Sequence, residues 1–136
     1  MTKAKRIFEL AQEGADAYQM YKARRAGAGT PYTDEVINQF LSKESRQSVD
    51  FWLGDEQTIM EMEFSAFSSP PVLEKEVFKA LLAKDAGNDV RHLILIGDPG
   101  SGLLSQAPTP AAIMNWVERR HQIRVHIWEL KDRDKP

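Results

Sequence analysis

The N-terminal part of the chain has a helical spacing of apolar residues. Between Lys3 and Arg25 the apolar positions recur every three or four residues, which places them on one face of an α-helix. Gly27-Ala28-Gly29 ends this pattern and predicts a flexible joint. A second helix is predicted after Thr33, an N-cap residue followed by acidic residues in the first turn. Its predicted buried stripe consists of Val36, Ile37, Phe40 and Leu41.

From residue 48 onwards, predicted strands and helices follow one another. Residues 48–53 and 59–64 alternate apolar and polar side chains, which is typical of β-strands. Ser69 followed by two prolines begins a predicted helix that runs to about Lys84. The remaining predicted elements are a buried strand over 93–96, a loop over 98–110, a helix over 111–121 and a strand over 123–130. This order predicts an α/β fold with a central mixed sheet of about four strands flanked by helices, and an extra N-terminal helix.

Three carboxylates are expected to converge on one face of the predicted hairpin. If residues 54–57 form its loop, the register places Asp50 opposite Glu61, with Cβ atoms about 5 Å apart. Glu63 shares the face of Glu61 because side chains repeat every two residues along a strand. Carboxylates this close repel one another and raise their own pKa values. A divalent cation such as Mg²⁺, which prefers oxygen ligands, would relieve the repulsion. The alternative is a solvent-facing strand with ordinary charges.

Composition and length are those expected of one cytoplasmic domain. The chain has 136 residues, divided here into an N-terminal helix and joint (1–29), a core (30–130) and a polar tail (131–136). With 42% apolar and 28% charged residues it can build a core. The absence of cysteine excludes disulfides, thiolate metal sites and a cysteine nucleophile. Neither a secretory signal nor a membrane-spanning apolar run is expected from the pattern.

Three segments carry a resemblance to a known family: SVDFWLGDEQTIMEMEFS, then LEKEVFKALLA, then RHLILIG. Together they resemble the PD-(D/E)XK restriction-endonuclease-like nuclease superfamily. In that superfamily a helix precedes a hairpin that carries an Asp and then an acidic-x-Lys pair, and a helix, a strand, a helix and a strand follow. The resemblance covers roughly Thr33 to Leu130. Asp50 matches the metal-binding Asp, and Glu61 matches the acidic residue of the second motif.

The chain departs from the superfamily's motif at two positions. Val49 stands where proline often stands, and Glu63 stands where lysine usually stands. In some members the lysine migrates to the following helix, and Lys75 and Lys79 are the candidates for such a lysine here. The resemblance implies that Lys79, or else Lys75, stabilises the pentavalent phosphate or positions the nucleophile. The alternative for both is a pair of lysines whose stems lie along a partly buried helix.

The resemblance also implies a metal site. Asp50 and Glu61 would bind Mg²⁺ or Mn²⁺, helped by the backbone carbonyl of Met62. Glu63 would be a second ligand or would orient the attacking water. Glu35, on the preceding predicted helix, would add a carboxylate or, alternatively, only complement the helix dipole.

Two further features bear on the partners of the protein. Arg119, Arg120 and Arg124 gather near a predicted helix-to-strand junction, where they would meet DNA phosphates or, alternatively, complement a helix C-terminus. Residues 97–102 are rich in glycine, but Leu103 and Leu104 stand where a P-loop has its lysine and hydroxyl, so no nucleoside triphosphate is expected. That segment is then a loop of turn residues or one whose amide groups contact a DNA backbone.

The sequence-based hypothesis is therefore a Mg²⁺-dependent endonuclease-like phosphodiesterase that hydrolyses DNA. A monomer this small is not expected to read a DNA sequence, and the resemblance implies a homodimer or a larger complex. The first alternative is a non-catalytic module of the same fold that binds nucleic acid or a protein. The second is an unrelated α/β interaction domain whose carboxylates are surface residues.

Overall fold

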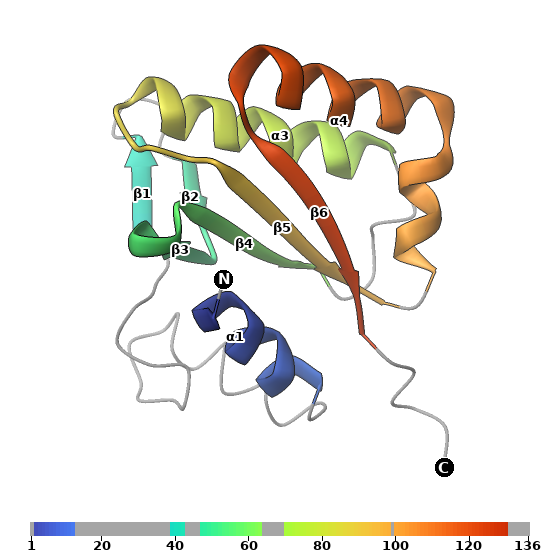
Figure 1. The fold of residues 1–136 in the computed structure, drawn as a ribbon, viewed down its shortest axis with the longest axis horizontal. Helices are drawn as coiled ribbons and strands as arrows, with labels where there is room; N and C mark the ends of the chain where they lie inside the picture. The colour runs from blue at the N-terminus through green and yellow to red at the C-terminus, as the bar shows by residue number, and fades with distance from the viewer. Residues whose placement is uncertain (1, 13–38, 43–46, 64–69, 99, 131–136) are drawn as a thin grey trace.

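A four-stranded sheet forms the centre of the structure (Figure 1). The computed structural model describes residues 2–12, 39–42, 47–63, 70–98 and 100–130. The strands of the central sheet, in spatial order, are β3 (Phe51–Leu53), β4 (Thr58–Glu63), β5 (His92–Gly97) and β6 (Arg124–Glu129). β3 is antiparallel to β4, whereas β4, β5 and β6 are parallel. The predicted mixed sheet of about four strands is confirmed.

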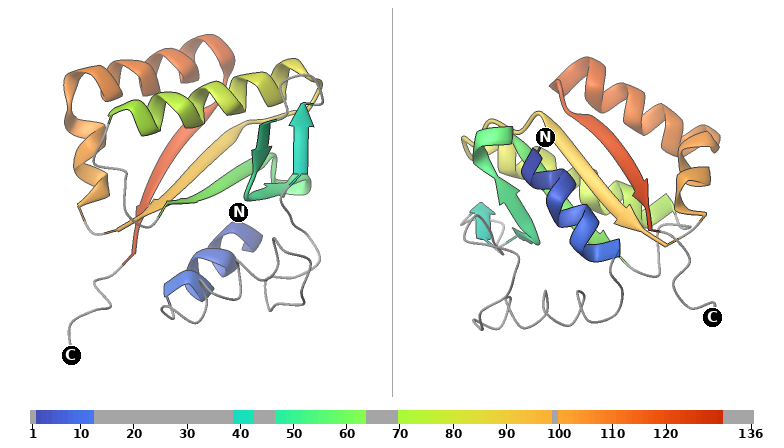
Figure 2. Two further views of the ribbon diagram at one scale, coloured as in Figure 1. Left: turned by 180° about the vertical axis from the view of Figure 1, so that it is seen from behind. Right: turned by 60° about the horizontal axis from the view of Figure 1, so that its bottom comes forward.

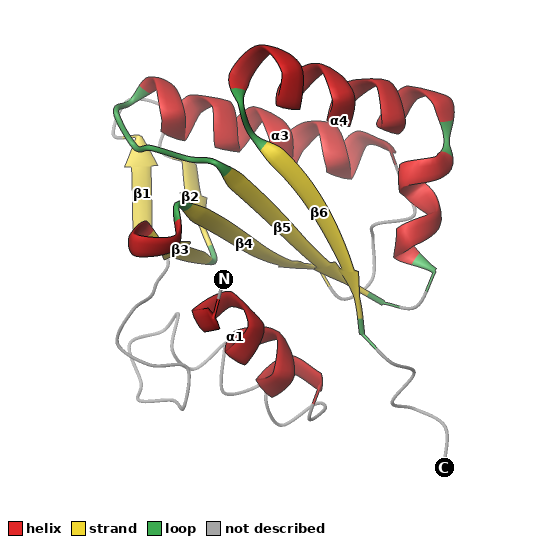
Figure 3. Ribbon diagram, in the orientation of Figure 1, coloured by secondary structure: helices red, strands yellow, loops and turns green. Residues whose placement is uncertain are grey.

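Helical segments make the connections between these strands (Figure 3). A short 3₁₀ helix, η1 (Gly54–Glu56), joins β3 to β4. The chain between β4 and β5 includes α3 (Pro70–Asp85), and the chain between β5 and β6 includes η2 (Ser101–Gln106) and α4 (Pro108–His121). Parallel neighbouring strands require such crossovers, because a tight turn can join only antiparallel strands.

Helices cover both faces of the sheet (Figures 1 and 2). α3 and α4 lie on one face, and α1 (Thr2–Gln12) lies on the other. β5 shows why both faces are covered, because its apolar side chains alternate between two cores. Leu93 and Leu95 pack under α3 and α4, while Ile94 and Ile96 pack against α1. A strand buried on both faces reads as a continuous apolar run, which explains the sequence of β5.

The hairpin of β3 and β4 has the register expected from the sequence. Leu53 pairs with Thr58, Trp52 with Ile59 and Phe51 with Met60. The loop predicted over 54–57 is confirmed: it consists of η1 and a residue with positive φ, Gln57.

The strand predicted over 48–53 is not continuous. It bends at Asp50, so that β2 (Gln47–Val49) pairs with β1 (Gln39–Ser42) in a separate two-stranded sheet, while β3 pairs with β4. The helix predicted to include Phe40 and Leu41 is accordingly wrong over Gln39–Ser42, which is β1. The apolar pairs at 36–37 and 40–41 fit a helical stripe, but pairing with β2 determines the conformation of this segment. Residues 33–38 lie outside the described ranges.

The other predicted boundaries agree more closely. α3 begins and ends within one residue of its prediction. α1 begins as predicted, and residues 13–25 lie outside the described ranges. The segment 98–110 is not a simple loop, because it contains η2 and the first turn of α4. Pro108 and Pro110 indicated a loop, but proline is tolerated in the first turn of a helix, where its missing N–H has no partner to lose. Among the described helices, none combines the length and apolar character needed to cross a bilayer.

Candidate functional site

Three carboxylates and one ammonium group meet between β4 and α3. Asp50, Glu61 and Glu76 are buried, with relative exposures of 9%, 6% and 8%. Nζ of Lys79 lies 2.9 Å from Oε1 of Glu61 and 3.5 Å from Oε2 of Glu76. We call these four residues the carboxylate–lysine cluster.

The hairpin positions two of the carboxylates. Continuing its register by one residue brings Asp50 level with Glu61. The bend at Asp50 lets its side chain reach across to β4, where Oδ2 accepts a hydrogen bond of 2.8 Å from the backbone N–H of Met62. Glu61 follows Ile59 by two residues, and it therefore points to the same face of the sheet, the one covered by α3 and α4.

Helix α3 supplies the other two members of the cluster. Glu76 and Lys79 are three residues apart, so they occupy the same side of the helix. Their neighbours Leu73, Val77 and Ala80 are buried in the core beneath α3. The polar pair is therefore carried towards the sheet by the packing of this apolar stripe.

The electrostatics of the cluster are dominated by burial and by an excess of negative charge. Burial raises the pKa of Glu61 well above its usual value, and the charges of Asp50 and Glu76 raise it further against the opposing effect of Lys79. Burial likewise raises the pKa of Glu76, although Lys79 opposes it. Burial alone would lower the pKa of Lys79, but the charges of Glu61 and Glu76 outweigh it, and the pKa is raised. One ammonium group thus faces three carboxyl groups, which favours an added proton or cation.

Two buried oxygen atoms of the cluster have the ammonium group of Lys79 as their partner. They are Oε1 of Glu61 and Oε2 of Glu76, both buried and both facing Lys79 at ion-pair distance. Carboxylate oxygens are the ligands that Mg²⁺ and Mn²⁺ prefer, so the donor set fits such an ion chemically. Within the described residues, however, no group of three or more His, Asp or Glu side chains is already arranged to hold a metal.

The structure brings together three of the residues predicted from the sequence: Asp50, Glu61 and Lys79. Met62 contributes its N–H to Asp50, whereas the prediction concerned its carbonyl. Lys75 is exposed on α3, and its charge has a small lowering effect on the pKa of Glu76, which burial raises overall. Glu35 and the side chain of Glu63 lie outside what the structure describes.

The three arginines predicted to contact DNA lie outside the carboxylate–lysine cluster. Arg119 and Arg120 are exposed in the last turn of α4. Arg124 begins β6 and pairs with Glu118 at 2.8 Å. Its place in the sheet is level with Thr58, three residues before Glu61, so it lies at the edge where the parallel strands begin.

Glu76 was not among the residues predicted from the sequence. A signal for it exists, because Glu76 follows Leu73 by three residues and precedes Ala80 by four. That spacing places an ionisable side chain on the buried stripe of the helix. Buried carboxylates are rare unless they are paired, and Lys79 is the partner one turn further along.

The glycine-rich segment after β5 binds a carboxylate of the protein itself. The N–H groups of Gly100 and Gly102 donate to the two carboxylate oxygens of Glu129, at 2.6 and 3.0 Å. A Cβ atom at Gly102 would lie only 2.3 Å from Oε2 of Glu129, so glycine is needed for this close approach. These amide groups therefore hold the end of β6 in this structure.

The chain matches no protein-family model, no curated protein and no solved structure at a level that indicates a relationship. Its function is therefore argued from the carboxylate–lysine cluster.

Proposed function

We propose that the protein is a Mg²⁺-dependent phosphodiesterase of the restriction-endonuclease-like type that hydrolyses DNA. The observation that carries the proposal is the position of Lys79, whose ammonium group on α3 lies 2.9 Å from Glu61 on β4, beside Asp50. Two acidic residues from a hairpin and a lysine from the following helix are the groups that the resemblance calls for. Lys79 would then take the role of the motif's lysine, whose usual position is occupied by Glu63.

In this proposal each member of the cluster has a separate role. Asp50 and Glu61 would hold the metal, and the bond from Met62 N–H fixes the orientation of Asp50. Lys79 would stabilise negative charge on the scissile phosphate. Glu76 would position Lys79 through their contact of 3.5 Å. A bound Mg²⁺ ion supplies an activated water and neutralises charge on a phosphate oxygen.

Metal binding should also release a proton. Burial raises the pKa of Glu61, which favours its neutral form, and a metal binds the deprotonated form. The affinity for metal is therefore expected to rise with pH. Net proton release on binding, measured by calorimetry in two buffers of different ionisation enthalpy, would report this exchange directly.

The decisive experiment combines metal binding with plasmid nicking by the full chain. Wild type should bind Mn²⁺ and nick supercoiled plasmid in the presence of Mg²⁺ or Mn²⁺. Asp50→Asn and Glu61→Gln should each weaken Mn²⁺ binding at least tenfold and abolish nicking. Lys79→Met should abolish nicking while it leaves metal binding intact or stronger. Glu74→Gln, which removes an exposed carboxylate from the same helix, is the matched control and should behave as wild type. Nicking that persists unchanged in Asp50→Asn and Glu61→Gln would show that the active site is elsewhere.

One observation favours a second candidate function. Lys79 already neutralises part of the negative charge of Glu61 and Glu76, and the described residues hold no ready-made metal site. This favours a non-catalytic module of the same fold that binds nucleic acid or a protein. A wild-type protein that neither binds Mn²⁺ nor nicks plasmid, but still binds DNA in a salt-sensitive way, would support it.

A further inference from the structure

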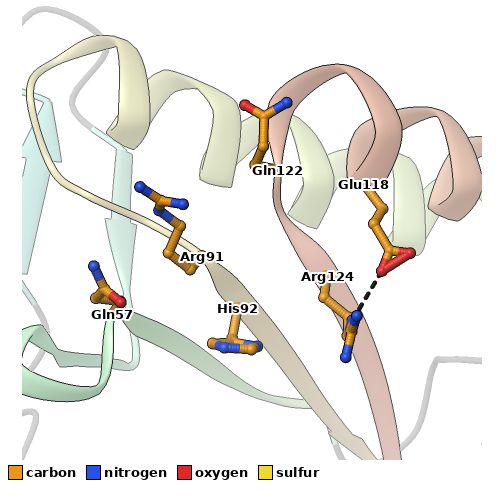
Figure 4. A pocket seen from close by; sticks show the side chains of 6 residues that line it. All are labelled: Gln57, Arg91, His92, Glu118, Gln122 and Arg124. Atoms are coloured by element: carbon orange, nitrogen blue, oxygen red, sulfur yellow. Dashed lines mark hydrogen bonds and ion pairs between the residues drawn. The ribbon is translucent and has the colours of Figure 1, made fainter.

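A polar pocket lies at the edge where the parallel strands begin, apart from the carboxylate–lysine cluster. Its volume is 540 Å³. Figure 4 shows the six side chains that line it: Gln57, Arg91, His92, Glu118, Gln122 and Arg124. They come from the turn before β4, the entry to β5, the end of α4 and the entry to β6. The charged side chains of the lining are two arginines and one glutamate, and Asp89 beside the pocket pairs with Arg91.

The backbone around the pocket is held in place by hydrogen bonds. The carbonyl of Gln57 accepts the N–H groups of both Arg91 and His92, at 2.9 and 3.0 Å. The carbonyl of Arg91 in turn accepts the N–H of Arg124, at 2.9 Å. The three chain segments that carry the arginines and the first glutamine are thus tied to one another before any ligand arrives. Such preorganisation lowers the entropic cost of binding.

Two residues of the lining adopt a backbone conformation that is uncommon for them. Gln57 and Gln122 have φ values of 52° and 55°, and they are the non-glycine residues with positive φ in the described part of the chain. Positive φ is uncommon for residues other than Gly, Asn and Asp. Unfavourable backbone conformations cluster at binding sites. Both occurrences here lie in one pocket, where Nε2 of Gln57 donates to Asp89 and Nε2 of Gln122 donates to the carbonyl of Arg119.

Each arginine is held by a carboxylate at one nitrogen atom only. Nε of Arg124 donates to Glu118, and Nε of Arg91 donates to Asp89, both at 2.8 Å. Among the described residues, the hydrogen bonds of the two guanidinium groups are made at Nε, and their terminal amino groups make none. These groups form the planar fork that matches two oxygen atoms of a phosphate. Asp89 and Glu118 therefore orient the arginines and leave the ligand-binding ends available.

The histidine of the pocket, His92 on β5, lies beside His126 on β6. Burial lowers the pKa of His92, and the charge of Arg124 lowers it further. Nδ1 of His92 also lies 3.1 Å from Nε2 of His126. Burial lowers the pKa of His126, and His92 and Arg124 lower it further against the opposing effect of Glu118. Because both pKa values are lowered, both rings favour the neutral form, and the two arginines are the cationic groups of the lining.

We propose that this pocket binds a phosphate group through the terminal amino groups of Arg91 and Arg124. The phosphate belongs either to a nucleotide monoester or to the backbone of a nucleic acid. The proposal does not depend on metal or on the carboxylate–lysine cluster, so it stands or falls separately from the nuclease function.

The test is equilibrium binding by the full chain in EDTA, which removes any metal-dependent contribution. The probes are inorganic phosphate, a deoxynucleoside 5′-monophosphate and a single-stranded oligonucleotide, each titrated by calorimetry at constant ionic strength. Wild type should bind at least one of them saturably. Tighter binding of the monophosphate identifies a nucleotide pocket, and tighter binding of the oligonucleotide identifies a site for a nucleic-acid backbone.

Variants separate the pocket from general charge effects. Arg91→Gln and Arg124→Gln should each weaken binding at least tenfold, and Arg124→Lys should weaken it at least threefold because it keeps the charge but loses the fork. Arg6→Gln, which removes an exposed arginine from α1, should stay within twofold of wild type. Thermal unfolding checks that each variant is folded. If Arg91→Gln is not folded, Arg91→Lys takes its place. The proposal is overturned if wild type binds none of the probes, or if Arg6→Gln weakens binding as much as the pocket variants do.

Discussion

Replacing Lys79 with methionine tests the electrostatics of the cluster without any assumption about function. Nζ of Lys79 is 2.9 Å from Glu61, and at an effective dielectric constant near 20 this separation corresponds to an attraction of about 6 kcal/mol. Desolvation of the two charges offsets much of that value. Removing one partner of a buried pair leaves the other charge uncompensated, which typically costs about 3–5 kcal/mol. We therefore expect Lys79→Met to lower the free energy of unfolding by about 3–5 kcal/mol at pH 8.

The size of this loss should depend on pH in one direction. The pKa values of Glu61 and Glu76 are raised by burial, and Lys79 holds them lower than burial alone would. Without Lys79 they rise further. A carboxyl group whose pKa is higher in the folded than in the unfolded state stabilises the fold fully at pH values below its unfolded pKa. This stabilisation is lost as the pH rises through the folded pKa. The variant should therefore lose stability from about pH 4.5 upward, so its deficit at pH 5 should be smaller than at pH 8.

Urea-induced unfolding, followed by circular dichroism at pH 5 and pH 8, measures both effects. Lys75→Met is the matched control, because Lys75 is exposed on the same helix; its substitution should change the free energy of unfolding by no more than about 0.5 kcal/mol. The double variant Glu61→Gln/Lys79→Met should recover much of the loss, since it removes one of the unpaired charges. A deficit below about 1 kcal/mol at pH 8, or an equal deficit at both pH values, would refute the inference that Lys79 compensates buried carboxylates.

Two further predictions concern the backbone. Gly102→Ala should displace the carboxylate of Glu129 from the two loop amides and lower the free energy of unfolding by about 1 kcal/mol, while the same substitution in a Glu129→Ala background should have almost no effect. Equal losses in both backgrounds, measured by urea-induced unfolding, would contradict the contact. Gln122→Gly should raise the melting temperature, because glycine adopts the left-handed conformation at the end of α4 without penalty and stabilises by about 0.5–1 kcal/mol. A lower melting temperature would mean that the glutamine side chain contributes more than its backbone conformation costs.

The elements that could be predicted are those specified by local sequence. Pro70 and Pro71 mark the start of α3, and the alternation on both sides of Gly54 defines the hairpin and its register. β1 could not be predicted because its conformation depends on pairing with β2, and the apolar spacing of Phe40 and Leu41 is compatible with a helix as well. The local sequence shows only the spacing of apolar residues. Where that spacing is compatible with both a helix and a strand, tertiary contacts determine which one forms.

The candidate site was predictable in part for the same reason. Asp50 and Glu61 are brought together by the hairpin, so their separation follows from a count of residues. The approach of Glu76 and Lys79 to Glu61 depends on how α3 docks on the sheet, which no local spacing specifies. The residues that line the polar pocket come from four segments, and they become neighbours only when the parallel strands align.

The topology explains how a lysine on α3 comes to lie beside a carboxylate of β4. A helix that follows a strand in a parallel crossover packs on the face of the same sheet, because the connection is short and right-handed. The buried stripe of α3 must therefore meet the side chains that β4 directs to that face, and Glu61 is one of them. A lysine one turn after Glu76 then reaches the carboxylates without any change in the fold. Glu63 stands where the motif has its lysine. Under the proposed function the site still has an ammonium group, because Lys79 supplies it from α3, on the other side of the interface between helix and sheet.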